Sequence, residues 1–498
     1  MSQPSLPTAA TVHHDRRWLI LAVIGIAQLL IVLDVTIVNI ALPSAQRDLG
    51  FSDAQRQWVI SAYALAFGGL LLLGGRFADL LGRKRTLIAG LLGFAGASAV
   101  GGAAQSFGML VAARGVQGVF AAMLAPSALS LLATTFTDAA ERGKAFGVYG
   151  AVAGTGGAFG LLLGGALTQV LDWRACLYVS LVFALPAAAA ALRLLHHVPV
   201  LDRPPLDIPG ALTASAGLFA LVFGLSHAER HGWGDPVTVA FLAGGAVLLA
   251  VFVAIQRGVA HPLLPLRVVA DRNRGGSFLA VGTAGAGIFG VFLFLTFYLQ
   301  NTKGFTALET GLAFLPLSVS VIAAATVVST RLLARTGPRP LVPTGMALAA
   351  LGMALLTRIG VDTSYASHVL PSLILIGLGF GTVLASSIAT ATLGVPERDS
   401  GVASAMVSTA QQVGGSIGTA LLSTFALSAA NSFVADHSPA PAIFRQAAVE
   451  GYVRAFWWAA AIFAAGALVC GALLRSDARP TPAHGTPEAA PAPVPAAS

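Results

Sequence analysis

Apolar segments of membrane-spanning length recur along the whole chain. An α-helix rises 1.5 Å per residue, so about 20 apolar residues cross the roughly 30 Å hydrocarbon core of a bilayer. Fourteen segments reach about this length: 18–42, 56–76, 84–104, 108–133, 143–170, 173–193, 207–228, 236–256, 276–301, 307–331, 340–358, 367–394, 400–430 and 452–474. The alternating strands of roughly ten residues that build a membrane β-barrel are absent from the sequence. The predicted fold class is therefore an all-α polytopic membrane protein with 14 transmembrane helices.

The scarcity of charged residues supports a lipid bilayer as the solvent. Only 10% of the 498 residues are charged and 56% are hydrophobic, whereas a soluble domain carries about 25% charged residues. The formal net charge of +8 would suggest a nucleic-acid partner in a soluble protein. Here the basic residues lie in short loops between apolar runs, so we expect the bilayer as a partner and no nucleic acid.

The basic residues are distributed unequally between the two sides of the membrane. If the first span starts inside, the inner segments contain 20 of the 29 Lys and Arg, the outer segments contain 8, and one arginine lies within a span. Cytoplasmic loops are enriched in Lys and Arg, so this asymmetry predicts that both termini are cytoplasmic. We predict a multi-pass protein of a bacterial inner membrane.

Two features of the loops repeat at nearly the same offset. Gly82 corresponds to Gly337, 255 positions later, and the pair 141–142 corresponds to 397–398, at an offset of 256. Such an offset indicates two related six-helix halves. The predicted organisation is a cytoplasmic tail at 1–15, a first half at 16–195, a linker with an inserted helix pair at 196–258, a second half at 259–475 and a disordered cytoplasmic tail at 476–498.

The most charge-dense turn, 75–85, separates the second and third apolar runs. Its residues of interest are Gly75, Asp79, Gly82, Arg83 and Lys84. Asp79 can contact the end of a neighbouring helix, and the two basic side chains can pair with carboxylates or with a helix C-terminus. We predict that these contacts close the cytoplasmic side in one conformation, which makes the turn a gating loop. Topology determination by basic residues is the alternative, but it does not account for Asp79.

Two charged residues lie well inside the apolar runs, the acid Asp34 and the cation Arg114. A carboxylate in hydrocarbon is costly and is often neutralised by binding a proton, which suits a proton-coupled carrier. The helix rise places the two residues at similar depths, about 12 Å and 9 Å from the outer surface. Asp34 is therefore a candidate partner for Arg114, as is Gln117. The alternatives are that Asp34 bonds to Thr36 or Asn39 and that Arg114 extends to the interface.

Glycines recur at helical spacing in the fifth apolar run. The set includes Gly156, Gly160, Gly164 and Gly165. Small residues four positions apart let two helix backbones approach closely, and they permit local bending. The run is therefore a candidate for motion between helices, although packing alone would also explain its composition.

Together these motifs resemble those of the major facilitator superfamily, in particular its fourteen-span drug:proton antiporter branch. The string 33–43 resembles the first-span motif of that branch, and 114–118 resembles its fourth-span motif, whose arginine is implicated in proton coupling. The loop 75–85 resembles a motif of the whole superfamily. One position departs from the pattern, because the fifth-span motif Gly-Pro-x-x-Gly-Gly has Leu161 in place of proline. Proline would kink the helix by removing a backbone donor.

The resemblance implies a central substrate cavity between the two halves. The cavity candidates, chosen by their polarity, are Gln28, Asn39, Gln117, Tyr298, Gln300 and Asn301. Most polar groups in a helix bundle are simply hydrogen-bonded within it, so these assignments depend on the resemblance. The resemblance implies a role in proton coupling for Arg114, and the position of Asp34 inside an apolar run makes it the proton-binding candidate, so these two are the predicted proton-coupling residues.

The leading hypothesis is the export of hydrophobic or amphipathic small molecules, such as drugs or antibiotics, in exchange for protons by alternating access. The alternative that Leu161 favours is a facilitator or a specific metabolite exporter without proton coupling. An enzyme or a sensor would need clustered catalytic side chains, whereas the ten histidines are scattered. We expect no enzyme activity, no cofactor and no metal, and Cys176 and Cys470 as free apolar side chains. The oligomeric state is left open.

Overall fold

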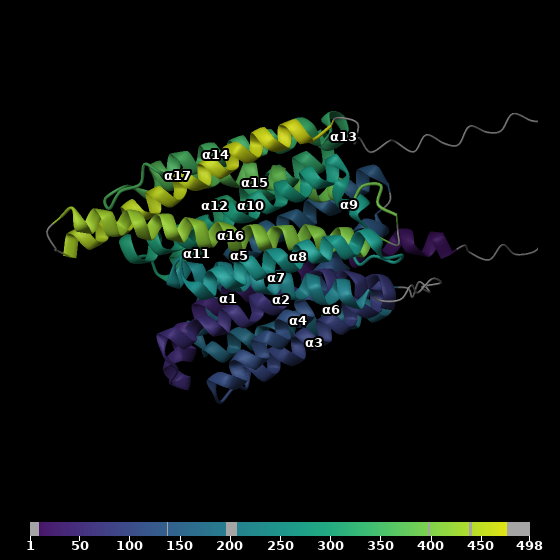
Figure 1. The fold of residues 1–498 in the computed structure, drawn as a ribbon, viewed down its shortest axis with the longest axis horizontal. Coiled ribbons are helices and arrows are strands. Elements are labelled where there is room, and N and C mark those ends of the chain that lie inside the picture. The colour runs from purple at the N-terminus through teal and green to yellow at the C-terminus, as the bar shows by residue number, and fades with distance from the viewer. Residues whose placement is uncertain (1–8, 137, 196–206, 397–398, 438–440, 476–498) are drawn as a thin grey trace, which may run out of the picture.

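The computed structural model describes residues 9–136, 138–195, 207–396, 399–437 and 441–475 (Figure 1). All regular structure within these residues is helical, and 13 of their helices are long and apolar enough to cross a membrane. A further span is a bent helix whose limbs, Glu141–Gly157 and Phe159–Val170, meet at 41°. The predicted all-α class and the predicted 14 spans are confirmed.

Six helices form the first half of the bundle. They are α1 (Ala9–Leu49), α2 (Asp53–Leu81), α3 (Arg83–Gly102), α4 (Phe107–Thr135), α5 (Ala139–Val170) and α6 (Trp173–Leu194). Helix α2 packs along α4, α3 packs against α4 and α6, and α1 packs against α5 and α6. Because α1 begins at Ala9, it starts inside the segment predicted as a tail.

An inserted helix pair and the second half follow. The pair consists of α7 (Ile208–His231) and α8 (Pro236–Gly258). The second half consists of α9 (Leu266–Ala270), α10 (Arg272–Phe297), η1 (Tyr298–Thr302), α11 (Ala307–Ala313), α12 (Leu315–Val327), η2 (Val328–Leu332), α13 (Leu333–Thr336), α14 (Pro338–Leu356), η3 (Tyr365–Val369), α15 (Leu370–Ala391), α16 (Ser400–Ala435) and α17 (Pro441–Leu473). The three η elements are single π-helical turns within longer spans. Cys176 and Cys470 are free and buried, one in each half.

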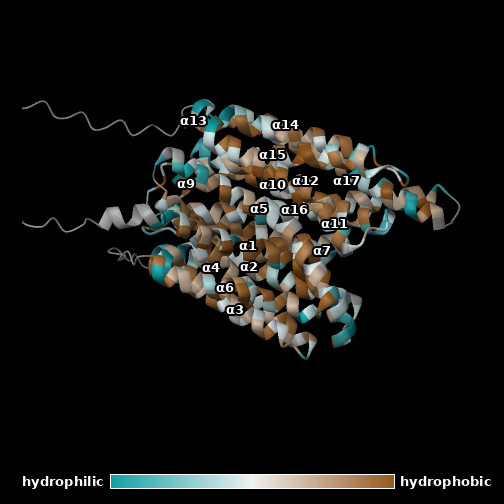
Figure 2. Cartoon of the chain, turned by 180° about the vertical axis from the view of Figure 1, so that it is seen from behind, coloured by the Kyte–Doolittle hydropathy of each residue, from teal (hydrophilic) through white to brown (hydrophobic). Residues whose placement is uncertain are grey.

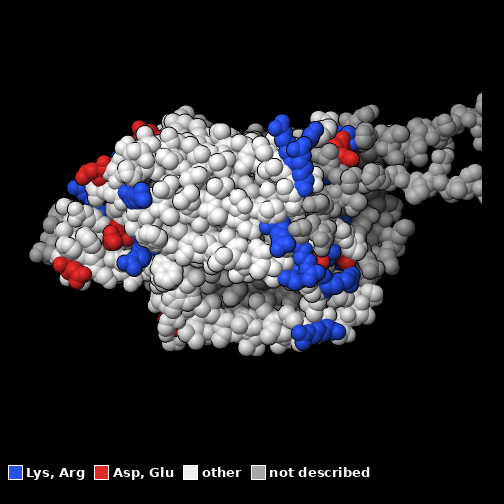
Figure 3. Space-filling view, turned by 90° about the horizontal axis from the view of Figure 1, so that it is seen from above, with Lys and Arg blue, Asp and Glu red and all other residues white. Residues whose placement is uncertain are grey.

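The bundle has an apolar middle and two polar ends. Hydrophobic residues fill the middle, and the hydrophilic colours lie near the ends (Figure 2). On the face shown in Figure 3, Lys and Arg gather in a band toward one end with a few acidic side chains beside them, whereas fewer basic side chains mix with acidic ones at the other end. We call the first the basic end, where α1 begins, α17 ends and the loop 75–85 lies, and we call the other the opposite end (Figure 1).

The two halves meet along two seams. Helix α5 packs against α12 and α15, while α2 and α4 pack against α16. In Figure 1 the other helices of the first half lie below these seams and those of the second half above them. The two halves are therefore in contact along both seams.

The inserted pair lies across the second of these seams, since α7 packs against both α2 and α16. Near the opposite end, the ring of Trp58 on α2 lies 6.4 Å from that of Phe223 on α7. Trp233, in the turn between α7 and α8, donates from Nε1 to Thr424 Oγ1 of α16 at 2.9 Å. The pair is thus attached to both halves.

A buried polar cluster fixes the basic end of the inserted pair. Asp207 caps α7 by accepting the Gly210 N–H at Oδ1, 2.8 Å away, while Gln256 Nε2 donates to Oδ2 at 2.7 Å. Gln256 in turn accepts the Leu264 N–H at 2.9 Å. One carboxylate thereby joins the start of α7, the end of α8 and the segment that leads into α9.

Asp207→Ala is expected to lower the stability by about 2–3 kcal/mol. The helix cap accounts for about 1 kcal/mol, and the amide of Gln256 loses its buried partner. The matched control is Asp235→Ala, which removes the cap of α8 at a half-buried site and should cost about 1 kcal/mol. Thermal unfolding in detergent measures both variants. Equal losses would mean that the Gln256 contact adds nothing.

The internal repeat has a counterpart in the backbone. Gly82, between α2 and α3, has a φ of 90°, and Gly337, between α13 and α14, has a φ of 73°. Side chains avoid this left-handed region, so glycine permits the same sharp turn in both halves. The other repeated feature includes 397–398, which lies outside the described residues, as do the linker at 196–206 and the tail at 476–498.

Candidate functional site

The two charged residues inside the apolar runs form an ion pair. Asp34 lies on α1 and Arg114 on α4, and Arg114 Nη1 is 2.5 Å from Asp34 Oδ2. The exposed fraction is 0% for Asp34 and 2% for Arg114. The two spans are neighbours in the bundle, which their similar depths alone did not establish.

Gln117 links the ion pair to a third helix. Its Nε2 donates to Asp34 Oδ1 at 3.2 Å and to Ser98 Oγ of α3 at 2.7 Å. Its Oε1 accepts a hydrogen bond from Arg114 Nη1 at 2.9 Å. The amide therefore contacts both partners, and we assign Gln117 to this network, away from the substrate-cavity candidates.

Helix α2 contributes the remaining contacts of the arginine. Arg114 Nε donates to the backbone oxygen of Val59 at 3.2 Å, and its guanidinium carbon lies 4.5 Å from the centre of the Tyr63 ring. The Tyr63 hydroxyl is buried with no hydrogen-bond partner among the described residues. Sequence reasoning missed Val59, Tyr63 and Ser98, because neutral residues in an apolar run give no signal of such a contact.

The local alternatives for Asp34 are not adopted. Thr36 donates its hydroxyl to the Leu33 carbonyl at 3.0 Å, and Asn39 is exposed. The carboxylate instead depends on Arg114 and Gln117 from α4. A buried charge that loses its counter-charge is strongly destabilised, so a proton on Asp34 would change how Arg114 is held.

One face of α5 presses against α1 around Asp34. A Cβ at Gly156 would lie 2.9 Å from Val32 Cβ, and one at Gly160 would lie 1.8 Å from Thr36 Oγ1. Gly164 makes a similar contact, and the buried Gly165 follows it. Only glycine allows the two backbones to come this close. The predicted glycine helix therefore supports the helix that carries the acid.

The other face of α5 presses against the second half. A Cβ at Gly143 would lie 2.1 Å from the backbone oxygen of Ser329 in η2, and one at Gly154 would lie 2.5 Å from Val321 Cγ1 of α12. A Cβ at Gly157 would lie 3.0 Å from Phe292 Cζ of α10. Helix α5 therefore contacts α1 with one set of glycines and the other half with a second set.

Helix α5 bends although it lacks the proline of the related motif. The 41° bend lies between Gly157 and Phe159, next to Leu161. Glycine removes the side-chain restraint on the backbone, so a glycine-rich helix can bend without losing a backbone donor to proline. The missing proline is thus no obstacle to a bent span.

The loop 75–85 contacts the start of α16 at the basic end. Asp79 Oδ1 accepts the N–H of Gly401 at 3.1 Å, and Arg83 Nη2 donates to Ser400 Oγ at 2.9 Å. Since α16 begins at Ser400, the carboxylate lies at the positive end of the helix dipole. A Cβ at Gly75 would lie 2.7 Å from the Gly401 oxygen, so glycine permits the approach of α2 to α16.

Further contacts, which sequence reasoning did not find, join the halves at this end. Arg142 Nη2 donates to Thr392 Oγ1 at 2.9 Å, and Ser130 bonds to Ser400 at 2.7 Å. Within the first half, Lys84 Nζ donates to the Leu192 carbonyl at 2.9 Å, near the C-terminus of α6. The contacts of Arg142 and Ser130 join residues far apart in sequence, so no local pattern predicts them. The pairing of Lys84 with a helix C-terminus is one of the two pairings that the sequence suggested.

Asp79→Asn is expected to loosen the basic end. The amide keeps the acceptor for Gly401 but loses the charge at the helix N-terminus, which contributes about 1–2 kcal/mol at a partly buried site, or a shift of roughly 5- to 30-fold. Alkylation of a reporter, Ser404→Cys on α16, should accelerate accordingly. Arg85→Gln, an exposed change in the same loop, is the control. Equal rates in both variants would show that the charge of Asp79 does not hold this end closed.

The first-half cavity candidates lie in different surroundings. Gln28 is buried and its Oε1 accepts the hydroxyl of Tyr149 on α5 at 2.7 Å. Asn39 is exposed near the opposite end of α1. Gln28 therefore belongs to the α1–α5 contact, while Asn39 remains accessible.

The second-half cavity candidates fall in the π-helical turn η1. Tyr298 is fully buried and donates its hydroxyl to the Gly360 carbonyl at 2.9 Å, so this hydroxyl is already occupied within the second half. Gln300 is half-buried and Asn301 is exposed. π-Helical turns are frequent at functional sites, because the altered register reorients side chains. Sequence reasoning did not find these turns.

The fold and the buried ion pair define a polytopic helical carrier of two halves, one of which encloses a charge network. The chain belongs to the Major Facilitator Superfamily, which residues 24–419 match. It is thus a multi-pass membrane transporter.

Named relatives narrow the comparison. The chain is 50% identical over 480 residues to the puromycin resistance protein pur8 of Streptomyces alboniger, across 96% of this chain and 95% of that protein. It is 39% identical over 401 residues to the cephamycin export protein CmcT of Amycolatopsis lactamdurans, across 80% and 82%. The solved structure of the human organic anion transporter MFSD10 (TETRAN) has a TM-score of 0.63 at 16% identity, across 94% of this chain and 100% of that one. That likeness shows a shared fold.

Proposed function

We propose that this transporter exports hydrophobic or amphipathic small molecules, antibiotics among them, from a bacterial cell in exchange for protons. Similarity to proteins named for puromycin resistance and for cephamycin export supports the substrate class. Puromycin is the first compound to test. The observation that carries the proton coupling is the buried pair of Asp34 and Arg114.

The first step of the proposed cycle is proton binding at Asp34. A proton neutralises the carboxylate, and Arg114 then keeps only Gln117, the Val59 carbonyl and the Tyr63 ring. Because the buried arginine has lost its counter-charge, the contact between α1 and α4 becomes less stable, which favours their separation. Loss of the proton restores the pair.

The second step transmits this change through α5. On one face of α5 the glycines present no side chains that would interlock with α1, and on the other face they present none that would interlock with the second half. Helix α5 can therefore slide against both neighbours. Movement of α1 against α5 can therefore rock one half against the other. Opening of the basic end would break the contacts of Asp79 with Gly401 and of Arg142 with Thr392.

We place the basic end, and with it both termini, in the cytoplasm, because Lys and Arg accumulate on that side. The transport unit then consists of the halves 16–195 and 259–475, with the inserted pair on their common seam. The loop 75–85 is the cytoplasmic gate of this arrangement. Asn39, Gln300 and Asn301 are the proposed contacts of the substrate on the outer side.

The proton gradient is strong enough for this task. One proton moving down a gradient of one pH unit and 100 mV releases about 3.7 kcal/mol, which sustains a concentration ratio of about 500-fold for an uncharged substrate. A one-to-one exchange therefore suffices for useful export, and no nucleotide is required.

The test is transport in sealed proteoliposomes with an imposed pH gradient. Puromycin and a panel of lipophilic dyes should accumulate on the acidic side only while the gradient lasts, and a proton ionophore should stop accumulation at once. Flux at the same rate with and without the gradient would mean a facilitator. If dyes are transported in a proton-driven manner and puromycin is not, the proposal of proton antiport stands and only puromycin as a substrate is overturned.

A further inference from the structure

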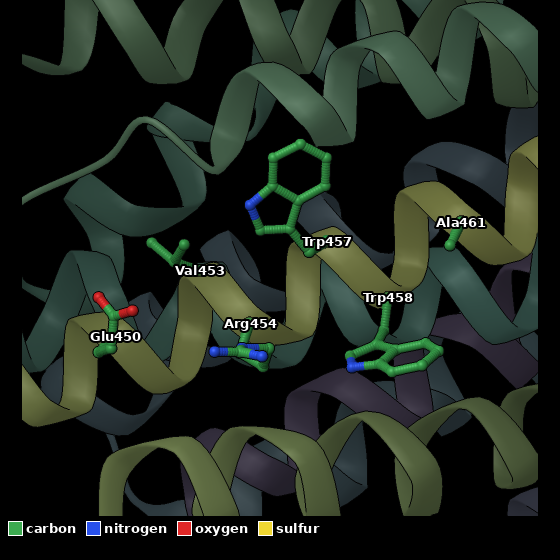
Figure 4. A pocket seen from close by; sticks show the side chains of 6 residues that line it. All are labelled: Glu450, Val453, Arg454, Trp457, Trp458 and Ala461. Carbon is green, nitrogen blue, oxygen red and sulfur yellow. The ribbon is translucent and has the colours of Figure 1, made fainter. Parts of the chain in front are cut away.

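A stripe of charged, aromatic and small apolar side chains follows one face of α17 near the opposite end. Its members are Glu450, Val453, Arg454, Trp457, Trp458 and Ala461. The spacing of three and four residues places them on one side of the helix, where they line a depression of about 430 Å³ (Figure 4).

The stripe lies at the level where the hydrocarbon ends. Helix α17 has 33 residues and ends at Leu473, next to the basic end. About 20 residues cover the hydrocarbon core, so the boundary falls near Arg454. Trp457 and Trp458 then lie just inside the interface, and Glu450 lies one turn farther out.

The two charged residues of the stripe are available to a ligand. Arg454 is exposed and Glu450 is half-buried, and neither has an ion pair or a hydrogen bond within the part of the chain that the structure describes. Their spacing of four residues would allow a mutual ion pair, yet the side chains lie apart in Figure 4. Trp458 is fixed by stacking on Phe425 of α16 at 4.4 Å, whereas 56% of Trp457 is exposed.

We propose that this stripe binds a phospholipid whose head carries a primary amine and a phosphate, as in phosphatidylethanolamine. The order of groups along the helix matches their order along such a lipid. Glu450, the outermost, faces the ammonium group, and Arg454 faces the phosphate. The two tryptophans meet the glycerol and ester region, where aromatic side chains are most stable, and Ala461 leaves room for an acyl chain.

Charge complementarity selects this head group over the other common ones. An anionic head without an amine would leave Glu450 unpaired and beside a like charge. A quaternary ammonium head balances the charge but has no N–H to donate to the carboxylate. An ordinary aromatic belt with an arginine that extends to the interface accounts for the tryptophans and Arg454 but not for Glu450. This lipid site does not depend on the proposed export or on its coupling to protons.

Quenching of tryptophan fluorescence tests the proposal in nanodiscs that contain a minor fraction of a lipid brominated near its ester groups. Phosphatidylethanolamine, phosphatidylcholine and phosphatidylglycerol are compared with identical acyl chains. In the wild type, the brominated ethanolamine lipid should show an about fivefold preference, equivalent to about 1 kcal/mol for an exposed ion pair. Subtraction of the signal of Trp457→Phe/Trp458→Phe assigns the quenching to the stripe.

Two variants separate the contributions of the charges. Glu450→Gln should remove the preference for the amine, and Arg454→Gln should reduce quenching by all three lipids. Arg445→Gln, at another exposed arginine of α17, is the matched control and should behave as the wild type. Equal quenching of the wild type by the three lipids would overturn the proposal and show that the stripe is an ordinary aromatic belt. Loss of lipid quenching on addition of puromycin, with no head-group preference before it, would assign the depression to substrate.

Discussion

Asp34→Asn is expected to abolish proton-driven export while the protein still reaches the membrane. Asparagine has nearly the shape of aspartate and can still accept a hydrogen bond from Arg114, but it cannot bind and release a proton at this position. In proteoliposomes with an imposed pH gradient, accumulation of puromycin should fall to the level of protein-free vesicles. Accumulation at the wild-type rate would place the coupling proton elsewhere.

The same substitution should also reduce stability, which gives the assignment a second, independent measurement. A buried arginine without its counter-charge costs about 3–5 kcal/mol, so thermal unfolding in detergent should occur at a lower temperature. The double variant Asp34→Asn/Arg114→Gln removes both charges and should recover most of that stability but none of the transport. If the double variant is no more stable than the single one, the ion pair is not the main contact of Asp34.

Gly143→Ala is expected to force the basic end open. The added methyl group would lie 2.1 Å from the backbone oxygen of Ser329, which cannot rotate away. Overpacking of this kind costs about 1–3 kcal/mol, which corresponds to a shift of roughly 5- to 150-fold between two conformations. Alkylation of the reporter Ser404→Cys should accelerate, and transport should slow because the closed state of this end becomes rare.

Gly150→Ala on the same helix is the matched control for this experiment. Its Cβ would lie 3.9 Å from its nearest neighbour outside α5, the backbone nitrogen of Ala385, which is an ordinary contact. It should leave both alkylation and transport unchanged. Since separation of the halves relieves the clash at Gly143, the unfolding temperature should change little. A large fall in that temperature without faster alkylation would show that the contact supports folding and not gating.

Several features of this fold were predictable from the sequence, because the bilayer allows few solutions. Helices are the only open-ended structure that satisfies its backbone in hydrocarbon, so the length of the apolar runs predicts the spans. The isolated charges Asp34 and Arg114 were recognisable as candidate site residues for the same reason, since a charge in a span needs a partner. Their similar depth made that partnership a reasonable hypothesis.

The rest of the site was not predictable, because it depends on contacts between distant segments. Ser98 and Tyr63 are ordinary residues until α2 and α3 bring them beside Arg114. The partner of Asp79 is a backbone N–H, and every residue other than proline offers one. The glycines of α5 predict that this helix can bend, but they predict neither the position of the bend nor its angle of 41°.

The inserted pair preserves the orientation of the second half relative to the first. Helices α7 and α8 run in opposite directions, so the chain returns to the end of the bundle at which α7 begins (Figure 1). An even number of added crossings keeps the second half in the same orientation as the first, so both repeats of the basic turn, at Gly82 and Gly337, face one compartment. A single added helix would have inverted the second half, and the turns at Gly82 and Gly337 would have faced opposite sides of the membrane. An insertion between duplicated halves of this kind is therefore restricted to pairs.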